Sequence, residues 1–485
     1  MKKRIVISLI ISLILSTILL TIIFYKQSYE VIPPELVCKD CSVILITMTN
    51  LRYDHMSYNG YSRPTTPNLD ILAKESIVFD NAFSHASWTL PEVISLYTGF
   101  YPLRHGIMER NDGSKLPQEI PTIIEVLKKA GYTSAAFTGG FDYKVDYGLT
   151  GRFDKFERCG ESMEPVPEWA SERYTGSKIF GEFECIIPKA LAWIKKNTSR
   201  KFFLHVQGYD AHCPFSQRGG KTFDPDYQGK VDFSNCLLTL ERKEPVVIDG
   251  NRYYLVSSQK QPIREEVLLS EQDVDHLIAI YDESIAFADR QIGKLLEEIK
   301  RSGLFDKTII VFTSEHGDMF GKKGMFMRGG TRMGTFYDDV LHVPLIVRNP
   351  KLKTLRTNGL VSHIDIVPTL LDFLGLRKLN TDGESIIPLI VRGEEVRREV
   401  FTGVKFRSRT ADLWFTQKSY ADVIRTKEWK LIQETVVNED DVSSKNIELY
   451  DIINDKEELH NLALERKDIL GKMQGQLSNW SKTVQ

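Results

Sequence analysis

The distribution of apolar and polar positions predicts buried strands that alternate with amphipathic helices. A continuous apolar run, rich in β-branched residues, stands at residues 43–48, and mostly apolar runs at residues 202–207 and 308–313 predict two further strands. Such runs are typical of strands that are covered on both faces. Residues 271–302 carry apolar side chains at helical spacing, and residues 65–74 predict a shorter helix with a proline near its start. We therefore expect an α/β fold with a mostly parallel central sheet flanked by helices.

Two other regions depart from this pattern. Residues 217–265 are polar and weakly periodic, which predicts an insertion over one face, where loops that shape a substrate site often lie. Beyond residue 376, short strands separated by turns predict a small antiparallel C-terminal subdomain, with strands at 421–426, 429–433 and 448–451. The expected divisions are an N-terminal segment 1–24, a linker 25–41, a main domain 42–375 and a C-terminal subdomain 376–485.

The N-terminus has the pattern of a membrane anchor. Lys2, Lys3 and Arg4 precede residues 5–24, which are uncharged and mostly apolar, a length sufficient to cross a bilayer as a helix. Because the basic cluster lies first, residues 1–4 are expected in the cytoplasm and the main domain outside it. We expect a single-pass signal anchor in the cell membrane; a cleaved signal peptide is the alternative, although the apolar stretch is long for one.

Composition excludes some classes of function and favours an oxidising compartment. The chain has 485 residues and a formal net charge of -2, so charge gives no reason to expect a nucleic-acid partner. Six cysteines are compatible with disulfides outside the cytoplasm. Cys38 and Cys41 stand alone in the linker, without a second pair at zinc spacing, so they predict a local disulfide or no bond, and not a metal site.

Thr89 is the first candidate for chemistry. It stands at the start of an expected helix that ends at Gly99, and a helix N-terminus offers free N–H groups to an anionic ester. Thr89 and Glu92 also fit a capping box, in which Glu92 reaches back to the start of the helix. Taken alone, this segment favours the cap over the nucleophile.

Acidic and imidazole side chains follow the other expected strands. Glu315 and His316 come directly after an apolar strand, so both can reach one divalent cation, and Gly317 allows a sharp turn. The alternative is a surface turn, which the burial expected for that strand disfavours. His212 follows another strand, where it could protonate a leaving group; a single histidine is more often structural.

Taken in order, these segments resemble the sulfatase family of the alkaline-phosphatase superfamily, over residues 42–465. The segments that carry the resemblance are SVILITMTNLRYDH, SHASWTLPEVISLYTGFYPLRHG, FFLHVQGYDAHCPF, TIIVFTSEHGD, YDDVLHVPLIV, HIDIVPTLLDFLGL and ELYDIINDKEELHNLA. The resemblance implies an alkaline-phosphatase-like fold and one divalent metal (Ca, Mn, Mg or Zn) at the sheet edge. It also implies a nucleophile at the helix N-terminus that forms a covalent intermediate.

The family pattern assigns roles to seven positions. The nucleophile aligns with Thr89, and the further catalytic candidates are His212 and Arg328. The metal positions fall on Thr49, Asn50, Glu315 and His316.

The departures from the pattern concern the chemistry itself. Thr89 replaces the cysteine that becomes formylglycine, and Val93 replaces an arginine. Thr49 stands where the family has an aspartate, so the first metal loop lacks its charge, and Glu315 replaces a second aspartate. Residues 138–140 stand where a Lys-x-His element is usual. An alcohol nucleophile favours the phosphoester-cleaving or group-transferring relatives over formylglycine sulfatases.

Two functions follow from this resemblance. One is a sulfatase-like hydrolase or transferase that cleaves sulfate or phosphate esters through Thr89 and a weakly held divalent metal. The alternative is a catalytically inactive relative that binds an anionic glycan or lipid headgroup. In both cases the expected partners are an anionic ester (a glycan, lipid headgroup or small molecule) and the membrane.

Overall fold

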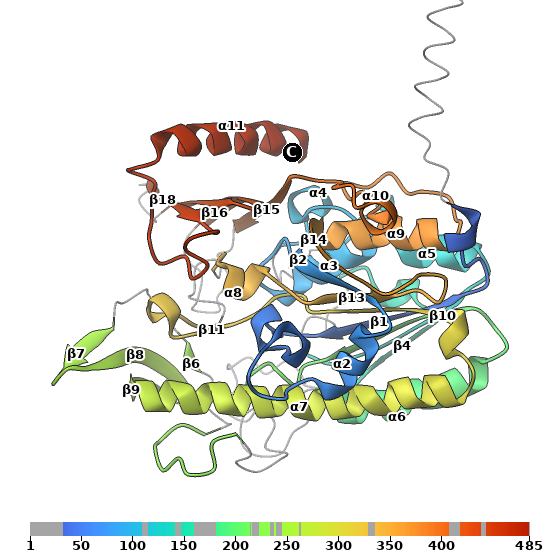
Figure 1. The fold of residues 1–485 in the computed structure, drawn as a ribbon, viewed down its shortest axis with the longest axis horizontal. Coiled ribbons are helices and arrows are strands. Elements are labelled where there is room, and N and C mark those ends of the chain that lie inside the picture. Colours follow the sequence, from blue (N-terminus) through green and yellow to red (C-terminus); the bar gives the residue numbers. More distant parts are fainter. Residues whose placement is uncertain are drawn as a thin grey trace, which may run out of the picture.

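An eight-stranded sheet forms the centre of the molecule (Figure 1). The computed structural model describes residues 33–108, 115–140, 147–159, 181–213, 215, 223–232, 237–238, 245–260, 263–327, 335–406, 418–437 and 443–484. In spatial order the strands are β14 (Leu355–Ser362), β2 (Ile77–Phe83), β13 (Leu345–Arg348), β10 (Thr308–Thr313), β1 (Ser42–Met48), β5 (Phe202–Gly208), β3 (Thr133–Thr138) and β4 (Lys155–Arg158).

The sheet is mostly parallel, as predicted. Strand β1 pairs in parallel with β5 and β10, and β3 pairs in parallel with β4 and β5. Strand β13 runs antiparallel to both of its neighbours, β10 and β2. The predicted strands at residues 43–48, 202–207 and 308–313 are therefore the three adjacent central strands, and all three end at one edge of the sheet.

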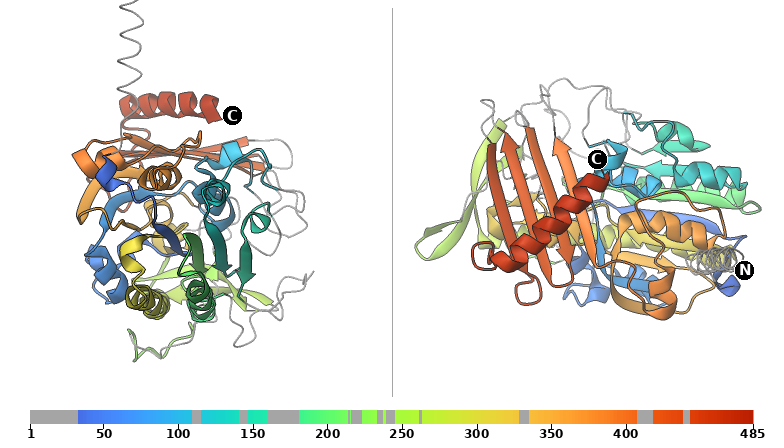
Figure 2. Two further views of the ribbon diagram at one scale, coloured as in Figure 1. Left: turned by 90° about the vertical axis from the view of Figure 1, so that its right-hand side faces the viewer. Right: turned by 90° about the horizontal axis from the view of Figure 1, so that it is seen from above.

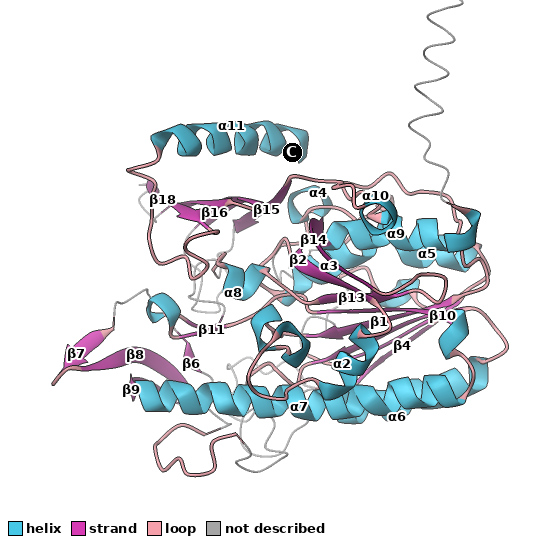
Figure 3. Cartoon of the chain, in the orientation of Figure 1, coloured by secondary structure: helices cyan, strands magenta, loops and turns pink. Residues whose placement is uncertain are grey.

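Helices cover both faces of the sheet, because successive side chains of a strand point to opposite sides (Figure 3). On β1, Ile44 and Ile46 pack in one apolar cluster while Val43 and Leu45 pack in the other. The first cluster contains residues of α2 (Pro67–Ala73), α6 (Phe183–Asn197) and α7 (Glu271–Arg301). The second contains residues of α3 (Thr89–Thr98), α5 (Ile123–Lys129), α9 (Ile366–Phe373) and α10 (Ile387–Arg392).

The C-terminal region forms the predicted antiparallel subdomain. Its strands are β15 (Glu399–Phe406), β16 (Lys418–Thr426), β17 (Trp429–Val437) and β18 (Ser443–Asp451), and α11 (Lys467–Val484) lies across them (Figure 2). The sequence pattern did not predict strand β15 or helix α11.

The expected insertion contains a second antiparallel sheet. It is formed by β6 (Leu237–Leu238), β7 (Val246–Ile248), β8 (Asn251–Lys260) and β9 (Ile263–Ser270).

Two short α-helices are α4 (Pro102–His105) and α8 (Asp338–Leu341). Strand β11 (Met319–Phe320) pairs with β12 (Phe326–Met327) in a short antiparallel hairpin. A 3-10 helix, η7 (His363–Asp365), precedes α9.

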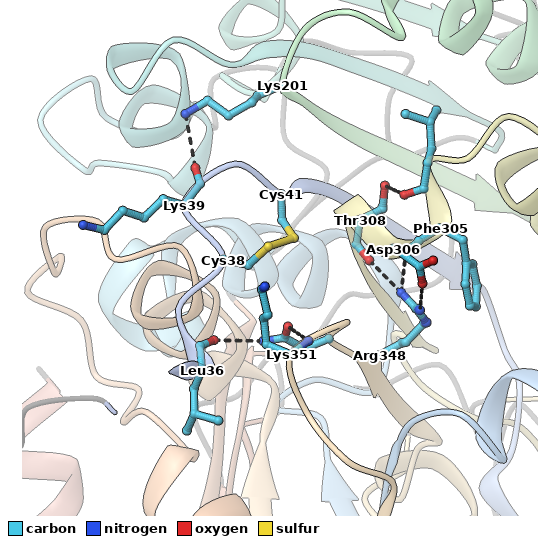
Figure 4. Close-up of a disulfide and its surroundings, with 12 residues drawn as sticks. Leu36, Cys38, Lys39, Cys41, Lys201, Phe305, Asp306, Thr308, Arg348 and Lys351 are labelled. Atoms are coloured by element: carbon cyan, nitrogen blue, oxygen red, sulfur yellow. Dashed lines mark hydrogen bonds and ion pairs between the residues drawn. A yellow bond between two sulfur atoms is a disulfide. The ribbon is translucent and has the colours of Figure 1, made fainter. Parts of the chain in front are cut away.

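The linker is fastened to the end of the sheet that lies opposite the strand ends described above. Cys38 and Cys41 form a disulfide immediately before β1, which confirms the local bond expected from their spacing (Figure 4). The backbone N–H of Cys38 donates to Phe373 O at 2.7 Å, and Lys201 Nζ donates to Lys39 O at 3.3 Å. The chain therefore enters the domain at the start of β1, one strand length away from the edge where β1 ends.

A second disulfide joins Cys159 to Cys185, and Cys213 is also disulfide-bonded. No helix within the described residues has the length and apolar character needed to span a bilayer. The anchor predicted at residues 5–24 lies outside the described residues, so it stays a prediction.

Asp289 of α7 holds the first turn of α2. Its carboxylate accepts hydrogen bonds from the backbone N–H groups of Asn68 and Leu69, both at 2.9 Å, and from Asn68 Nδ2 at 2.8 Å. Because Asp289→Ala would leave buried donors unpaired, we expect the free energy of unfolding to fall by about 2–4 kcal/mol in urea titrations. Glu297→Ala changes an exposed residue of the same helix and is the matched control, with an expected change within about 0.5 kcal/mol.

Candidate active site

The ends of three parallel strands bring polar side chains together at one edge of the sheet. In the register of the sheet, Thr47 of β1 lies beside Gln207 of β5 and Thr313 of β10. Thr49 follows β1 and Glu315 follows β10, so both project beyond the same edge as Gln207. Thr49, Gln207 and Glu315 are fully buried. The loop after β1 and the segment after β10 therefore lie side by side, as the predicted metal positions require.

The loop after β1 turns at Asn50. This residue has a left-handed backbone with φ of 68°, a conformation that asparagine tolerates better than most residues. Its Nδ2 donates to Asp318 Oδ2 at 2.8 Å, and its carbonyl accepts a hydrogen bond from Tyr281 Oη at 2.8 Å. Asn50 thus uses its side chain to join two loops of the site.

The segment after β10 is a buried turn, and not the surface turn that was the alternative. Ser314, Glu315 and His316 are all fully buried. Gly317 donates its N–H to Val340 O at 2.8 Å, and a Cβ on Gly317 would lie 2.0 Å from Asp339 O. Only glycine fits this close backbone approach, which fixes the direction of the His316 side chain.

Thr89 begins α3, as predicted, but the capping box is wrong. The N-cap is Trp88, and no side chain caps the helix. Glu92 instead accepts hydrogen bonds from the backbone N–H of His85 at 2.7 Å and from His363 Nδ1 at 2.6 Å. Glu92 is drawn to these buried donors because a carboxylate buried without partners would be costly. The Thr89 hydroxyl is therefore available to the site.

The Thr89 hydroxyl contacts an imidazole. Thr89 Oγ1 lies 3.2 Å from His316 Nε2, and His316 Nδ1 lies 2.8 Å from Gly317 O. Since a carbonyl oxygen can only accept, His316 Nδ1 carries a hydrogen, and in the neutral ring Nε2 is then the acceptor for the Thr89 hydroxyl. This pair has the arrangement of a nucleophile and its base.

Glu315 is the single carboxyl group among the four predicted metal positions. Burial raises its pKa to about 7, an effect that the neighbouring Thr47 and Thr49 hydroxyls partly offset. Gln207 Nε2 donates to Glu315 Oε1 and also to Thr49 Oγ1, the latter at 3.2 Å. Asn50 Oδ1, Gln207 Oε1 and Glu315 Oε2 are buried without a hydrogen-bond partner. The four predicted metal positions and Gln207 therefore present three open oxygen atoms but only one carboxyl group.

A divalent metal fits this donor set poorly. Hard cations prefer oxygen ligands, which Asn50, Gln207 and Glu315 provide, but their affinity depends on the number of charged ligands. Within the residues that the structure describes, no three His, Cys, Asp or Glu side chains gather in a way that could hold a metal ion. The divalent metal predicted at Thr49, Asn50, Glu315 and His316 therefore stays a prediction. The neutral side chains of Thr49 and Asn50 do not favour its binding.

The remaining predicted catalytic positions are His212 and Arg328. His212 follows β5, with Nδ1 2.5 Å from Cys213 O and its ring tilted against Tyr209. Its role as an acid toward the leaving group stays a prediction. Arg328 lies outside the described residues. Val93, at the position of the family's arginine, is buried in the apolar cluster beneath α3.

Sequence reasoning missed Gln207 and His363. Gln207 is a polar residue at the end of a mostly apolar strand, and that position could have identified it. His363 carried no local signal, because it reaches the site from η7, where its Nε2 lies 2.8 Å from Thr313 Oγ1. Only the packing of η7 against α3 and β10 brings His363 to Glu92.

Comparison with known proteins agrees with this fold. A family model described as Sulfatase matches residues 42–376, and one described as N-sulphoglucosamine sulphohydrolase, C-terminal, matches residues 330–483. The chain is 25% identical to Arylsulfatase K of Xenopus laevis over 342 residues, which cover 67% of this chain and 61% of that protein. It is 23% identical to Choline-sulfatase of Rhizobium meliloti over 441 residues, covering 82% and 77% of the two chains.

Solved structures share the fold. A 2-O GAG sulfatase has a TM-score of 0.68 and 20% identity, covering 92% of each chain. The phosphonate monoester hydrolase of Agrobacterium radiobacter has a TM-score of 0.66 and 21% identity, covering 91% of this chain and 96% of that one. The fold and site define an alkaline-phosphatase-like α/β protein. Because the Sulfatase model matches more than half of its length, the chain belongs to the sulfatase family.

The raised pKa of Glu315 predicts a pH-dependent stability. Between its ordinary pKa of 4.5 and about 7, the unfolded chain has released this proton while the folded chain retains it. Stability is therefore lost as pH rises through this window. Glu315→Gln removes the titration, so its free energy of unfolding relative to wild type should be more favourable at pH 8 than at pH 5 by about 2–3 kcal/mol. Urea titrations in EDTA measure this; an equal difference at both pH values would contradict a carboxyl group that is protonated when folded.

Proposed function

We propose that this protein cleaves phosphate or sulfate esters, or transfers their acid group, with Thr89 as nucleophile and His316 as its base. The observation that carries the proposal is the 3.2 Å contact between Thr89 Oγ1 and His316 Nε2, with His316 Nδ1 held by Gly317 O. The family supports ester hydrolysis as the class of reaction. The alcohol at position 89, in place of a formylglycine precursor, favours phosphate esters over sulfate esters.

The first step forms a covalent bond to Thr89. Thr89 Oγ1 attacks phosphorus or sulfur while its proton passes to His316 Nε2, and the bond to the leaving oxygen breaks. The N-terminus of α3, whose first residue is Thr89, presents backbone N–H groups and a positive dipole to the anionic group. His212 is proposed to give a proton to the leaving oxygen.

The second step releases the acid group. Water, or the hydroxyl of an acceptor molecule, attacks the group on Thr89 and gives its proton to His212, which regains the proton it lost in the first step. The bond between the group and Thr89 Oγ1 breaks, and His316 returns its proton to Thr89 Oγ1. Water gives hydrolysis and an acceptor alcohol gives transfer.

The substrate is proposed to be an anionic ester presented outside the cytoplasm. The relatives' names include a glycosaminoglycan sulfatase and a choline sulfatase, so a glycan, a lipid headgroup or a small ester are the substrate classes to test. We also propose that residues 5–24 anchor the chain in the cell membrane. Disulfides at Cys38–Cys41 and Cys159–Cys185 support an oxidising compartment for the main domain.

Substitution of Thr89 tests the nucleophile. The purified full-length chain is assayed with aryl phosphates and aryl sulfates, and peptide mass spectrometry is used to search for a phosphoryl or sulfuryl group on Thr89. Thr89→Ala should lower kcat by at least about 1000-fold, and Thr89→Ser should retain activity within about tenfold, because serine keeps the hydroxyl. Absence of turnover together with binding of an anionic saccharide would replace this proposal with the inactive, binding relative.

Substitution of His316 tests the base. His316→Gln removes the proton acceptor, so kcat should fall about 100- to 10,000-fold while KM changes little. His460→Gln is the matched control, because the side chain of His460 is 78% exposed, and its kinetics should equal those of wild type. A rise in KM at unchanged kcat in His316→Gln would assign His316 to binding and contradict its role as base.

A further inference from the structure

The side-chain amide of Gln207 lies where the first loop meets the turn after β10. Its Nε2 is hydrogen-bonded to Glu315 Oε1 and lies 3.2 Å from Thr49 Oγ1. All three residues are fully buried, so water does not compete for these bonds. The two hydrogens of the Gln207 amide thus join the loop after β1 to the turn after β10. In a metal site at this edge of the sheet, a cation would join the same two segments.

The orientation of this amide opposes cation binding. A cation bound between Thr49 Oγ1 and Glu315 Oε1 would compete for these oxygens with the Gln207 N–H groups, and Glu315 Oε2 is the one carboxyl oxygen of Glu315 without a hydrogen-bond partner. Turning the amide by 180° would place Gln207 Oε1 against Glu315 Oε1, and two acceptor oxygens at that distance require a proton or a cation between them. The hydrogen-bonded arrangement therefore needs no ion to hold it.

The other predicted ligands are also engaged in hydrogen bonds. Asn50 Nδ2 donates to Asp318, and the two ring nitrogens of His316 face Thr89 Oγ1 and Gly317 O. The open oxygens of Asn50, Gln207 and Glu315 remain as acceptors for hydrogens of water. Glu315 is the one carboxyl group among the four predicted metal positions, and the Asp318 carboxylate accepts from Asn50 Nδ2. A single carboxyl group offsets little of the cost of removing a divalent cation from water.

From these contacts we propose that the Gln207 amide takes the place of a divalent cation, fastening Glu315 to Thr49, so that the site is assembled without a bound divalent metal. The inference concerns the site of the proposed function but does not require turnover. Gln207 is a positioning residue, since it acts by holding Glu315 and Thr49.

Binding of Mn²⁺ tests the inference. The full-length chain is purified in detergent, stripped with EDTA and titrated with Mn²⁺, and free Mn²⁺ is followed by electron paramagnetic resonance. Wild type should show no binding with Kd below about 1 mM, whereas Gln207→Glu, which replaces the donor with a second carboxylate, should bind at least about tenfold more tightly. Gln433→Glu adds the same charge on β17, where Gln433 pairs with Gln474, and should behave as wild type.

Several results would overturn the inference. Binding of Mn²⁺ by wild type with Kd below about 1 mM, lost in Gln207→Ala, would show that the site holds a metal despite its low charge. A folded Gln207→Glu chain with no gain in affinity would show that the amide is not what excludes the ion.

Thermal unfolding keeps the test decisive if Gln207→Glu does not fold. A ligand that binds only the folded state raises Tm, so wild type should shift by less than about 1 °C between EDTA and 1 mM Mn²⁺ or Ca²⁺. A shift of several degrees would overturn the inference.

Turnover measured in EDTA separates this inference from the proposed function. A chain that neither binds metal nor turns over esters refutes the proposed function and leaves the inference standing. A chain that binds metal and turns over esters refutes the inference alone.

Discussion

The parallel pairing of β1 with β5 and β10 determines where every polar side chain of the site can lie. Parallel strands end at a common edge, and the residues that follow them must leave the sheet there. Apolar side chains on both faces hold the three strands, so the edge is the one place where this part of the chain can present polar groups without burying them in the core. The meeting of Thr49, Gln207 and Glu315 is a consequence of that register.

The C-terminal subdomain supports the site through a chain of buried ion pairs. Lys430 of β17 bonds Asp338 at 2.6 Å and Glu458 at 2.8 Å, and Arg425 of β16 bonds Asp338 at 3.1 Å. Asp338 begins α8, which lies between the C-terminal sheet and the central sheet (Figure 1). The carbonyl of Val340 in α8 then accepts from Gly317. Removing one partner of a buried ion pair costs about 3–5 kcal/mol, so these pairs hold α8 firmly in place. Helix α8 in turn holds the segment that carries His316.

The position that aligns with the family's nucleophile keeps a hydroxyl group, whereas the position that aligns with its first metal-binding aspartate is neutral. Thr89 keeps the place at the start of α3, where the helix favours anions. Thr49 and Asn50, by contrast, are neutral and hydrogen-bonded to neighbours. A neutral, buried network is stable only when its donors and acceptors match, and the Gln207 amide provides that match for Glu315 and Thr49. In the function proposed here, the nucleophile of this protein acts without a bound cation, whereas the two belong together in the mechanism that the family resemblance implies.

The sequence by itself determined the fold class, the central strands, the long helix α7 and the place of Thr89, Glu315 and His316. These features are local, because apolar periodicity and strand ends are written in consecutive residues. Sequence also indicated a bond between Cys38 and Cys41, since residues three apart can meet within one turn of chain. It misassigned Glu92, because a capping box depends only on spacing, while the buried donors that attract this carboxylate come from distant segments.

Only the tertiary structure decided which hydrogen bond each polar side chain makes. His316 faces Thr89 because Gly317 packs against α8, and Glu92 meets His363 because η7 packs against α3. Gln207 bonds Thr49 and Glu315 because three strands, far apart in the chain, end side by side. A linear pattern specifies which residues are polar and where strands end, but the partner of a buried donor depends on directions in space that no single segment contains.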